Sequence, residues 1–348
     1  MGEYARSAAI AQALLARWPG VAVHFVLSAR APYAQGAPFA KTLLDASPTL
    51  RSRPVIELLR SWRPSVVVFD NAGRSAQLAA AHAQGARVVF ISSRTRQRRK
   101  AFRLRWMRLI DEHWIAYPRF IAGGLTRLER LKLKLMGRPQ VRYLDVILAR
   151  PARPAAAAGD YVLVIPGGGT GHPGAPDATQ VFAAAAAQLA AAGFETRFVG
   201  PPAALAAGTA GTARLQALGM LAQGELATLM GGARLIVTNG GSTLLQSLAS
   251  GVACVAAPIA GDQRERIRRC VAQGAVVEAA LAAAPIAAAA AALLRDPEAC
   301  DALARRARAL AIEDGVEIAV QALARFIETG SAGEARSDGA ARSPGATG

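Results

Sequence analysis

The chain has few cysteines and few histidines among its 348 residues, three and four respectively. The cysteines, Cys254, Cys270 and Cys300, are odd in number and lack the paired spacing of a zinc site. This pattern argues against a disulfide scaffold and favours a reducing compartment. We therefore expect a cytoplasmic protein that holds no structural metal.

Long apolar runs are also missing. The longest uncharged stretch, residues 279–294, is mostly alanine and contains Pro285, so it falls short of the ~20 strongly apolar residues of a membrane span. Residues 1–20 carry Glu3, Arg6 and Arg17 in place of the apolar core of a secretory signal. The hydrophobic fraction of 52%, with 19% charged residues, excludes a wholly disordered chain and predicts packed cores in two domains.

Acidic residues are scarce in the first half only. Residues 1–150 hold 26 Lys and Arg against 8 Asp and Glu, a net +18, whereas the remaining residues hold 15 against 16, a net −1. Codon bias explains a general preference for arginine, but it does not explain why one half takes the whole excess. A basic first half indicates an anionic partner: a membrane surface, a phosphorylated substrate or nucleic acid.

The densest basic segment is 94–108, in which apolar residues alternate with cations. This mixture suits a helix on anionic lipid headgroups, and it equally suits a solvated helix whose apolar residues serve the core. Nucleic acid is the weakest alternative, because no nucleic-acid-binding motif accompanies the segment. The residues assigned to an acceptor or a membrane are Arg6, Arg94, Arg96, Arg98, Arg99 and Trp106.

Short apolar runs alternate with helix-length segments along the whole chain, as in 66–69, 87–91, 161–165, 235–238 and 254–257. Buried strands that alternate with helices predict parallel sheets with right-handed crossovers. The fold class expected is α/β, with two Rossmann-like, doubly wound domains. The domains are placed at 1–150 and 160–329, with a Pro/Ala-rich linker at 151–159 and a disordered Gly/Ser-rich tail at 330–348.

The beginning of the sequence departs from this pattern. A doubly wound domain opens with a strand that leads into a glycine-rich turn, but residues 1–6 already read as the turn, Met-Gly-Glu-Tyr-Ala-Arg. We expect that the first strand of this domain is missing. The alternative is a domain that simply starts with a helix.

A first glycine-rich turn, Pro-Gly-Gly-Gly-Thr-Gly-His-Pro-Gly at 166–174, follows the strand 161–165. Backbone amides in such a turn can approach phosphate. Residues 169–174 satisfy G-x-G-x-x-G, but the next strand ends in Gly-Pro-Pro without the acid that holds the ribose of NAD, and the P-loop ending is absent. His172 is either a phosphate or substrate contact or an exposed loop residue.

A second constellation is more specific. The strand 235–238 runs into Asn-Gly-Gly-Ser-Thr at 239–243 and opens a helix that carries Gln246, and the next strand is followed by Pro-x-x-Gly-Asp-Gln at 258–263. Both turns fall at the same edge of a parallel sheet, where a helix N-terminus favours an anion and polar side chains can reach hydroxyl groups. The alternative is two glycine-rich connectors with a polar turn.

These two motifs resemble the donor-nucleotide motif of the GT-B glycosyltransferases, in particular the MurG-like and UDP-glycosyltransferase-like enzymes and the related nucleotide-sugar hydrolase PseG. The resemblance is specific over 160–280 and only architectural over 1–150. It implies a diphosphate site, ribose contacts by Gln246 where the family usually has glutamate, sugar contacts by Asp262 and Gln263, and a base site near Leu221. The residues of the diphosphate site are Gly168, Gly169, Thr170, Gly240, Gly241, Ser242 and Thr243.

The N-terminal turn supplies candidate catalytic groups. Relatives often carry Gly-His-x-x-Arg there, and this chain has Gly2 and Arg6 with Glu3 near the position of the histidine. Glu3 would serve as general base if burial raised its pKa, and Asp70, which follows the strand 66–69, is the second candidate. Either carboxylate could instead cap a helix or a turn.

The resemblance therefore implies an inverting, metal-independent glycosyltransferase without a cofactor. It would transfer a sugar from a nucleotide diphosphate sugar, UDP-linked, to a lipid-linked, phosphorylated or saccharide acceptor at an interdomain cleft, at the inner face of a membrane. The alternatives are a PseG-like hydrolase, with water as acceptor, and a catalytically inactive GT-B binding protein. The sequence does not determine the oligomeric state.

Overall fold

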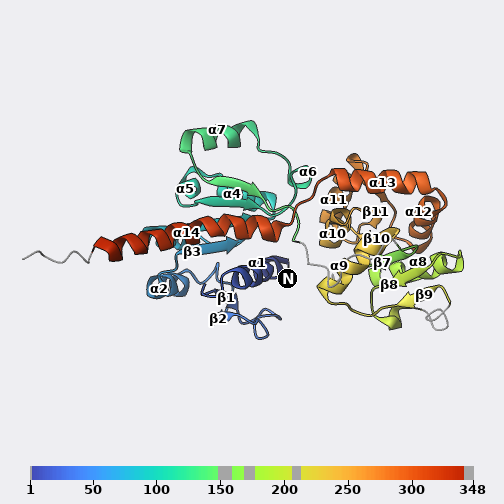
Figure 1. Ribbon diagram of the computed structural model, residues 1–348, viewed down its shortest axis with the longest axis horizontal. Coiled ribbons are helices and arrows are strands. Elements are labelled where there is room, and N and C mark those ends of the chain that lie inside the picture. Colours follow the sequence, from blue (N-terminus) through green and yellow to red (C-terminus); the bar gives the residue numbers. More distant parts are fainter. Residues whose placement is uncertain (1, 148–158, 168–176, 206–212, 341–348) are drawn as a thin grey trace, which may run out of the picture. The chain divides into compact units, whose positions relative to one another are not determined.

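The computed structural model of the protein describes residues 2–147, 159–167, 177–205 and 213–340 (Figure 1). The chain forms two compact units. Unit 1 contains the residues up to Ile147 together with those from Asp314 onward, and unit 2 contains Leu148–Glu313. Each unit is an α/β domain with parallel strands, as the alternation of apolar runs predicts.

Unit 2 is built on a six-stranded parallel sheet in the order β12-β11-β10-β7-β8-β9. Its strands are β7 (Val162–Ile165), β8 (Thr196–Phe198), β9 (Leu215–Ala217), β10 (Leu235–Asn239), β11 (Ala253–Ala257) and β12 (Val276–Glu278). Its helices are α8 (Ala178–Ala191), the 3-10 turn η1 (Pro202–Ala204), α9 (Gln223–Gly232), α10 (Ser242–Ala249), α11 (Gly261–Ala272), α12 (Ala283–Arg295) and α13 (Pro297–Ala309). β7, the first strand of this unit, lies in the middle of the sheet beside β10, its fourth strand, which is the order of a doubly wound α/β domain.

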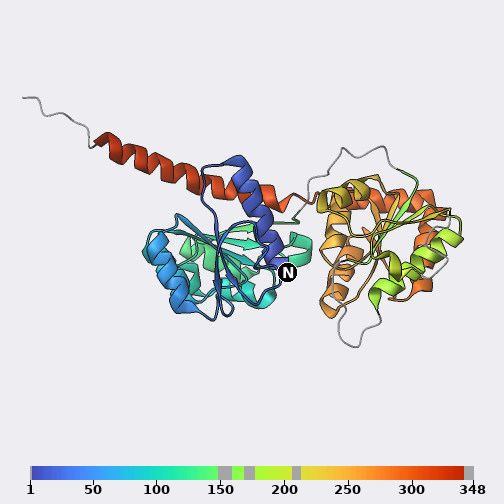
Figure 2. The same ribbon diagram turned by 90° about the horizontal axis from the view of Figure 1, so that it is seen from below.

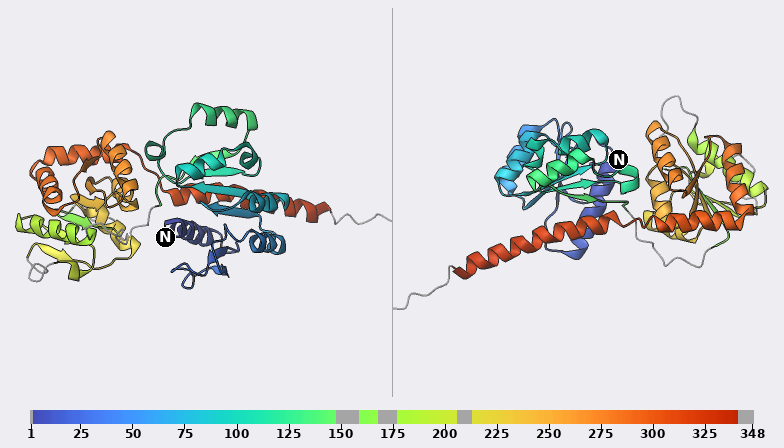
Figure 3. Two further views of the ribbon diagram at one scale, coloured as in Figure 1. Left: turned by 180° about the vertical axis from the view of Figure 1, so that it is seen from behind. Right: turned by 90° about the horizontal axis from the view of Figure 1, so that it is seen from above.

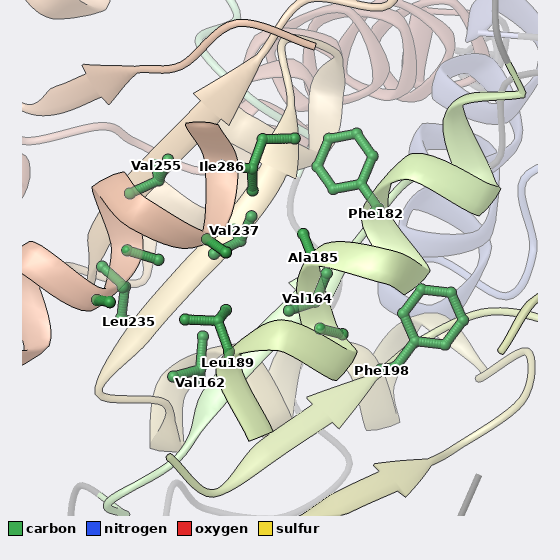
Figure 4. Close-up of a cluster of buried hydrophobic side chains, with 14 of the residues drawn as sticks. Val162, Val164, Phe182, Ala185, Leu189, Phe198, Leu235, Val237, Val255 and Ile286 are labelled. Carbon is green, nitrogen blue, oxygen red and sulfur yellow. The ribbon is translucent and has the colours of Figure 1, made fainter. Parts of the chain in front are cut away.

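Both faces of this sheet are buried. Phe182 and Leu189 of α8 and Ile286 of α12 pack on one face, over alternate valines of the central strands (Figure 4). The intervening side chains, such as Leu163 and Ile236, are fully buried as well, because α10 and α11 pack against the central strands β10 and β11. Strands that are covered on both sides need continuous apolar runs, which is why β7 reads Val-Leu-Val-Ile.

Unit 1 contains two parallel sheets, β1-β2 and β3-β4-β5-β6. The strands are β1 (His24–Ser28), β2 (Ala40–Leu44), β3 (Val66–Asp70), β4 (Arg87–Ser92), β5 (Glu112–Ile115) and β6 (Gln140–Tyr143). The helices are α1 (Gly2–Arg17), α2 (Ser52–Trp62), α3 (Ser75–Ala83), α4 (Thr95–Ala101), α5 (Leu104–Met107), α6 (Arg119–Ala122), α7 (Arg127–Met136) and α14 (Gly315–Ala340). Neither β2 nor β9 of unit 2 was predicted from the sequence.

The two sheets of unit 1 are separate at the position where the expected first strand would lie. A doubly wound order would place that strand between β1 and β3. In the described part of unit 1, β1 pairs only with β2, and β3 pairs only with β4. Val26 of β1 and Val67 of β3 nevertheless pack on one hydrophobic cluster. The two sheets therefore share a core without sharing hydrogen bonds.

The C-terminal part of the chain differs from the predicted domain organisation. Residues 314–329, placed in the second domain by sequence, belong to unit 1, because Ala319 and Leu323 of α14 pack in one cluster with Ile10 and Leu14 of α1. Figure 2 shows α1 (dark blue) lying against the red helix α14. The predicted disordered tail is also incorrect over 330–340, because α14 continues to Ala340. Residues 341–348 and the linker residues 151–158 lie outside the described residues.

Candidate nucleotide-sugar site

The carboxyl ends of β7, β10 and β11 lie side by side at one edge of the unit 2 sheet, since the three strands are adjacent and parallel. The chain continues from β7 to β8 on one side and from β10 to β11 on the other side. The carboxyl ends of β7 and β10 therefore form the topological switch point, where doubly wound domains bind ligands. Both glycine-rich turns singled out by sequence begin here. Gly167 is described, whereas Gly168, Gly169 and Thr170 lie outside the described residues.

Asn239, the last residue of β10, ties the two turns together. Its side-chain nitrogen donates a hydrogen bond to the carbonyl oxygen of Pro166 over 2.6 Å. Its side-chain oxygen accepts one from the amide of Gly241 over 2.7 Å. The side chain is buried. Asn239 was not among the predicted site residues, although its place at the end of a buried strand, directly before two glycines, was a signal for it.

The glycines around Asn239 are required by close packing. A Cβ atom on Gly167, whose φ is +83°, would overlap the amide of Asn239, and one on Gly241 would lie 2.7 Å from its side-chain oxygen. A Cβ on Gly240 would lie 2.8 Å from Gln263 Cβ and from Ile267. The absence of side chains therefore lets the loops after β7, β10 and β11 approach one another.

Gln263, in the first turn of α11, joins the third loop to this arrangement. Its side-chain oxygen accepts hydrogen bonds from the amides of Gly240 and Ile259, each over 3.1 Å. A neighbour on the same helix, Arg266, donates to the carbonyl oxygen of Gly240. The carbonyl group of Gln263 thus organises the loops, and only its amide nitrogen can serve the sugar contact that the resemblance implied. Arg266, which sequence analysis missed, brings a largely buried positive charge to the same edge.

The other predicted donor residues lie on the same unit. Ser242 and Thr243 form the first turn of α10. The N-cap residue is Gly241, so within the described part of the chain the N-cap offers no side chain to the first amides of α10. Gln246 lies one turn further along α10 and is half-buried. Asp262 is 74% exposed and pairs with Arg266 over 3.4 Å. Leu221 lies in the segment between β9 and α9 and is partly buried.

Unit 1 holds the two predicted catalytic carboxylates at the start of α1 and the end of β3. Asp70 is 10% exposed and accepts hydrogen bonds from Arg6 Nε over 3.0 Å and from Ser7 Oγ over 3.1 Å. Burial raises the pKa of Asp70, and the ion pair with Arg6 opposes that rise. Arg6, predicted to face an acceptor or a membrane, is instead buried in this pair and joins α1 to β3.

Glu3 stands in a more polar setting. Asn71 donates to its carboxylate over 3.3 Å and bridges to Ser93, and Arg94 lies 3.5 Å away. Burial acts to raise the pKa of Glu3, but a backbone hydrogen bond and the positive charges of Arg94 and Arg6 act against it, and the pKa is lowered. The condition set for Glu3 as general base, a pKa raised toward neutrality, is therefore not met. Asn71 and Ser93 were not predicted.

The basic segment 94–108 serves the core of unit 1 more than the predicted membrane surface. Trp106 is fully buried and packs on Phe90, and its ring nitrogen donates to Ser75. Arg98 is also largely buried and donates to three backbone carbonyls and to Glu129. These two assignments were wrong, because the residues face inward. Arg94, Arg96 and Arg99 are exposed.

Three further findings concern metal ligands, membrane-spanning helices and a surface hollow among the described residues. In 2–147, 159–167, 177–205 and 213–340 there is no group of three or more His, Cys, Asp or Glu side chains arranged to hold a metal ion. Within the same ranges, no helix has the length and apolarity needed to cross a bilayer. A hollow lined by Tyr161, Glu195 and Arg214 lies at the amino ends of the strands, opposite to the glycine turns.

Solved structures of other proteins identify the fold of this chain. No family model and no curated protein sequence matches the chain. Solved structures do match, and they show that the chain has the GT-B fold. The MurG of Acinetobacter baumannii is 16% identical, with a TM-score of 0.61 over 92% of this chain and 95% of that chain. UGT2 of Phytolacca americana, complexed with UDP-2-fluoro-glucose and pterostilbene, is 12% identical, with a TM-score of 0.62 over 92% and 95%.

A third similar structure carries the name of an epimerase and not of a glycosyltransferase. It is a putative UDP-N-acetylglucosamine 2-epimerase from Listeria monocytogenes, 16% identical, with a TM-score of 0.54 over 89% of this chain and 96% of that chain. The predicted resemblance to GT-B glycosyltransferases and the predicted fold class are thus confirmed at the level of the fold. The relation to PseG remains an expectation.

Proposed function

We propose that this protein is a glycosyltransferase that takes a sugar from a UDP-linked donor and transfers it to a lipid-linked, phosphorylated or saccharide acceptor. The observation that carries the proposal is the junction of the loops after β7, β10 and β11 through Asn239 and Gln263 at the switch point of unit 2. The neighbours of the same fold include a plant enzyme complexed with a UDP-sugar analogue. These observations support unit 2 as the donor domain.

In this proposal the diphosphate lies against the start of α10. The amides of Ser242 and Thr243 point out of the first helical turn, where the helix dipole adds partial positive charge. Arg266 adds a full positive charge behind Gly240. As the bond to the sugar breaks, these groups stabilise the negative charge on the leaving UDP, a role that needs no metal ion when the donors are already in place.

The remaining donor contacts follow from the same edge of the sheet. Gln246 would form a hydrogen bond with the ribose hydroxyls, as donor or as acceptor. Leu221 would lie near the nucleobase. The exposed carboxylate of Asp262 and the amide nitrogen of Gln263 would hold hydroxyl groups of the sugar. Gly168, Gly169 and Thr170 would complete the diphosphate site.

In this proposal unit 1 binds the acceptor and supplies the general base. Its net positive charge suits a phosphorylated or lipid-linked acceptor on an anionic membrane. Asp70 is the stronger candidate for the base, because burial raises its pKa, whereas the pKa of Glu3 is lowered. Deprotonation of the acceptor hydroxyl and displacement of UDP from the opposite side would invert the configuration at the sugar carbon.

The donor site can be tested by removing a single backbone amide. Ser242 is the first residue of α10, a position where proline is tolerated, and Gly241 before it is extended. Ser242→Pro therefore removes one proposed phosphate donor and keeps the helix. We expect UDP affinity, measured by calorimetry, to fall at least about tenfold, because a hydrogen bond to a charged group contributes about 1.5–3 kcal/mol and ~1.4 kcal/mol corresponds to a factor of ten. Ser242→Ala, which keeps the amide, should bind UDP like the wild type.

No heat of binding for UDP or UDP-sugars at millimolar concentration would refute the donor assignment. If UDP binds, release of UDP with and without saccharide or lipid-phosphate acceptors distinguishes transfer from hydrolysis. The epimerase among the neighbours favours isomerisation of a nucleotide sugar as a second candidate activity. Binding without any turnover would identify an inactive GT-B binding protein.

A further inference from the structure

The outer surface of α7 combines exposed leucines with exposed cations. Leu128, Leu131 and Leu135 are 59%, 52% and 75% exposed, and α7 has no buried residue. At ~100° per residue the three leucines fall within an arc of about 60° on the helix. They therefore form one continuous apolar stripe. We call this stripe, together with the exposed Arg127, Arg130 and Lys134, the outer α7 surface.

The helix is held in place from its other side. Glu129 pairs with Arg98 over 2.8 Å, and Lys132 donates to the carbonyl oxygen of Phe102 over 3.1 Å. Thr126 and Glu129 form a capping box that fixes the first turn. Figure 1 and the left view of Figure 3 both place α7 (green) at the outside of unit 1. None of the three leucines is buried in the core, and their exposure to water is unfavourable.

Charge decides which occupant fits this stripe. The exposed Arg127, Arg130 and Lys134 fall on one side of it. The only acid of α7, Glu129, is committed to Arg98, and Lys132 is bonded to the carbonyl oxygen of Phe102. A second copy of the chain packed there would bring these cations against one another. An anionic lipid surface satisfies both features, because the leucines enter the acyl boundary while the cations meet the headgroups.

We propose that the outer α7 surface is an interfacial lipid-binding site that docks unit 1 on a membrane containing anionic lipid. This site differs from the segment 94–108 that the sequence suggested, in which Trp106 and Arg98 face inward. Lipid binding of this kind does not require glycosyl transfer. The two proposals can therefore fail separately.

Vesicle sedimentation without nucleotide sugar tests the proposal. The full chain should bind vesicles of phosphatidylcholine and phosphatidylglycerol, bind pure phosphatidylcholine at least tenfold more weakly, and be released by salt. The triple variant Leu128→Gln, Leu131→Gln, Leu135→Gln should lose this binding. The double variant Arg127→Gln, Arg130→Gln should bind more weakly by about fivefold per charge. Circular dichroism verifies that the variants are folded.

Matched controls lie on α2 and in the segment before it. Leu50 is 64% exposed and Arg53 is exposed. Leu50→Gln and Arg53→Gln therefore remove an exposed leucine side chain and an exposed positive charge elsewhere on unit 1. Both should bind vesicles like the wild type. Equal binding of the leucine variant and the wild type, or no binding of the wild type, would overturn the proposal. So would a dimer in sedimentation velocity that the leucine variant abolishes, because a second copy would then cover the stripe.

Insertion itself can be measured with a polarity-sensitive fluorophore. The three native cysteines are buried in unit 2, so a label directed to Leu135→Cys reports that site selectively. Its emission should shift to shorter wavelength with anionic vesicles, whereas a label at Leu50→Cys should not shift. An unchanged emission at Leu135→Cys would show that the stripe does not enter the lipid, and would refute the site.

Discussion

Asn239 and Pro166 are 73 residues apart in sequence, yet the side-chain nitrogen of Asn239 donates to the carbonyl oxygen of Pro166 over 2.6 Å. The same side chain accepts from Gly241. This one buried amide thereby sets the spacing between the two loops to which the proposed diphosphate site belongs. Its carbonyl and nitrogen have different partners, which makes the position sensitive to an isosteric change.

Asn239→Asp should weaken both the fold of unit 2 and nucleotide binding. The carboxylate keeps the acceptor for Gly241 but places an oxygen against the carbonyl of Pro166 and adds a negative charge beside the proposed diphosphate. We expect a loss of about 1–3 kcal/mol in the free energy of unfolding, measured in urea, and more than tenfold weaker UDP binding. Asn71→Asp, a change of the same kind in unit 1, should leave UDP binding as it is.

Gly240→Ala should destabilise unit 2, because its Cβ would lie 2.8 Å from Gln263 Cβ and from Ile267, where only a backbone shift makes room. Overpacking of this kind costs about 1–3 kcal/mol. Gly261→Ala is the control, since its Cβ meets nothing within 4 Å. Urea unfolding of the two variants should differ by at least ~1 kcal/mol, and equal stabilities would contradict the packing argument.

Arg98→Gln should destabilise unit 1. Arg98 donates to the carbonyls of Ala122, Gly123 and Gly124 and pairs with Glu129, and its side chain is 11% exposed. The substitution leaves these acceptors and the Glu129 carboxylate without their cation, which costs about 3 kcal/mol. Arg96→Gln, at an exposed position on the same helix, should change the free energy of unfolding by less than about 0.5 kcal/mol.

His113 should make the protein sensitive to acid. Burial and the charge of Arg98 lower its pKa from 6.5 to about 3 in the folded state. Between those values the unfolded chain binds a proton that the folded chain does not, so this contribution to stability is lost as the pH falls from about 6.5 toward 3. At pH 4.5 the loss from this histidine is about 2–3 kcal/mol.

The pH dependence of His113→Leu isolates that contribution. The variant loses the contact of His113 with Ser92 Oγ, at 2.8 Å, and should be less stable than the wild type at pH 7. Its free energy of unfolding should nevertheless fall less steeply between pH 6.5 and 4.5. Parallel curves for the two proteins would show that His113 does not titrate in this way.

Local sequence patterns predicted most of the strands and the two glycine turns. Runs such as Val-Leu-Val-Ile at β7 could be recognised because a strand covered on both faces needs continuous apolar residues. The short strands β2 and β9 were missed, since three to five residues with ordinary composition carry no such pattern. The predicted roles of Arg98 and Trp106 were wrong because local charge density does not reveal which side of a helix faces the core.

The sequence by itself therefore determined the α/β class, the parallel strands and the place of the glycine turns at strand ends. Only the tertiary structure decided that Asn239 and Gln263 join three loops, that Arg6 is held by Asp70, and that α14 returns to pack on α1. The physical reason is distance along the chain. Periodicity reports how a residue relates to its near neighbours, whereas these contacts join residues that only the folded sheet brings together.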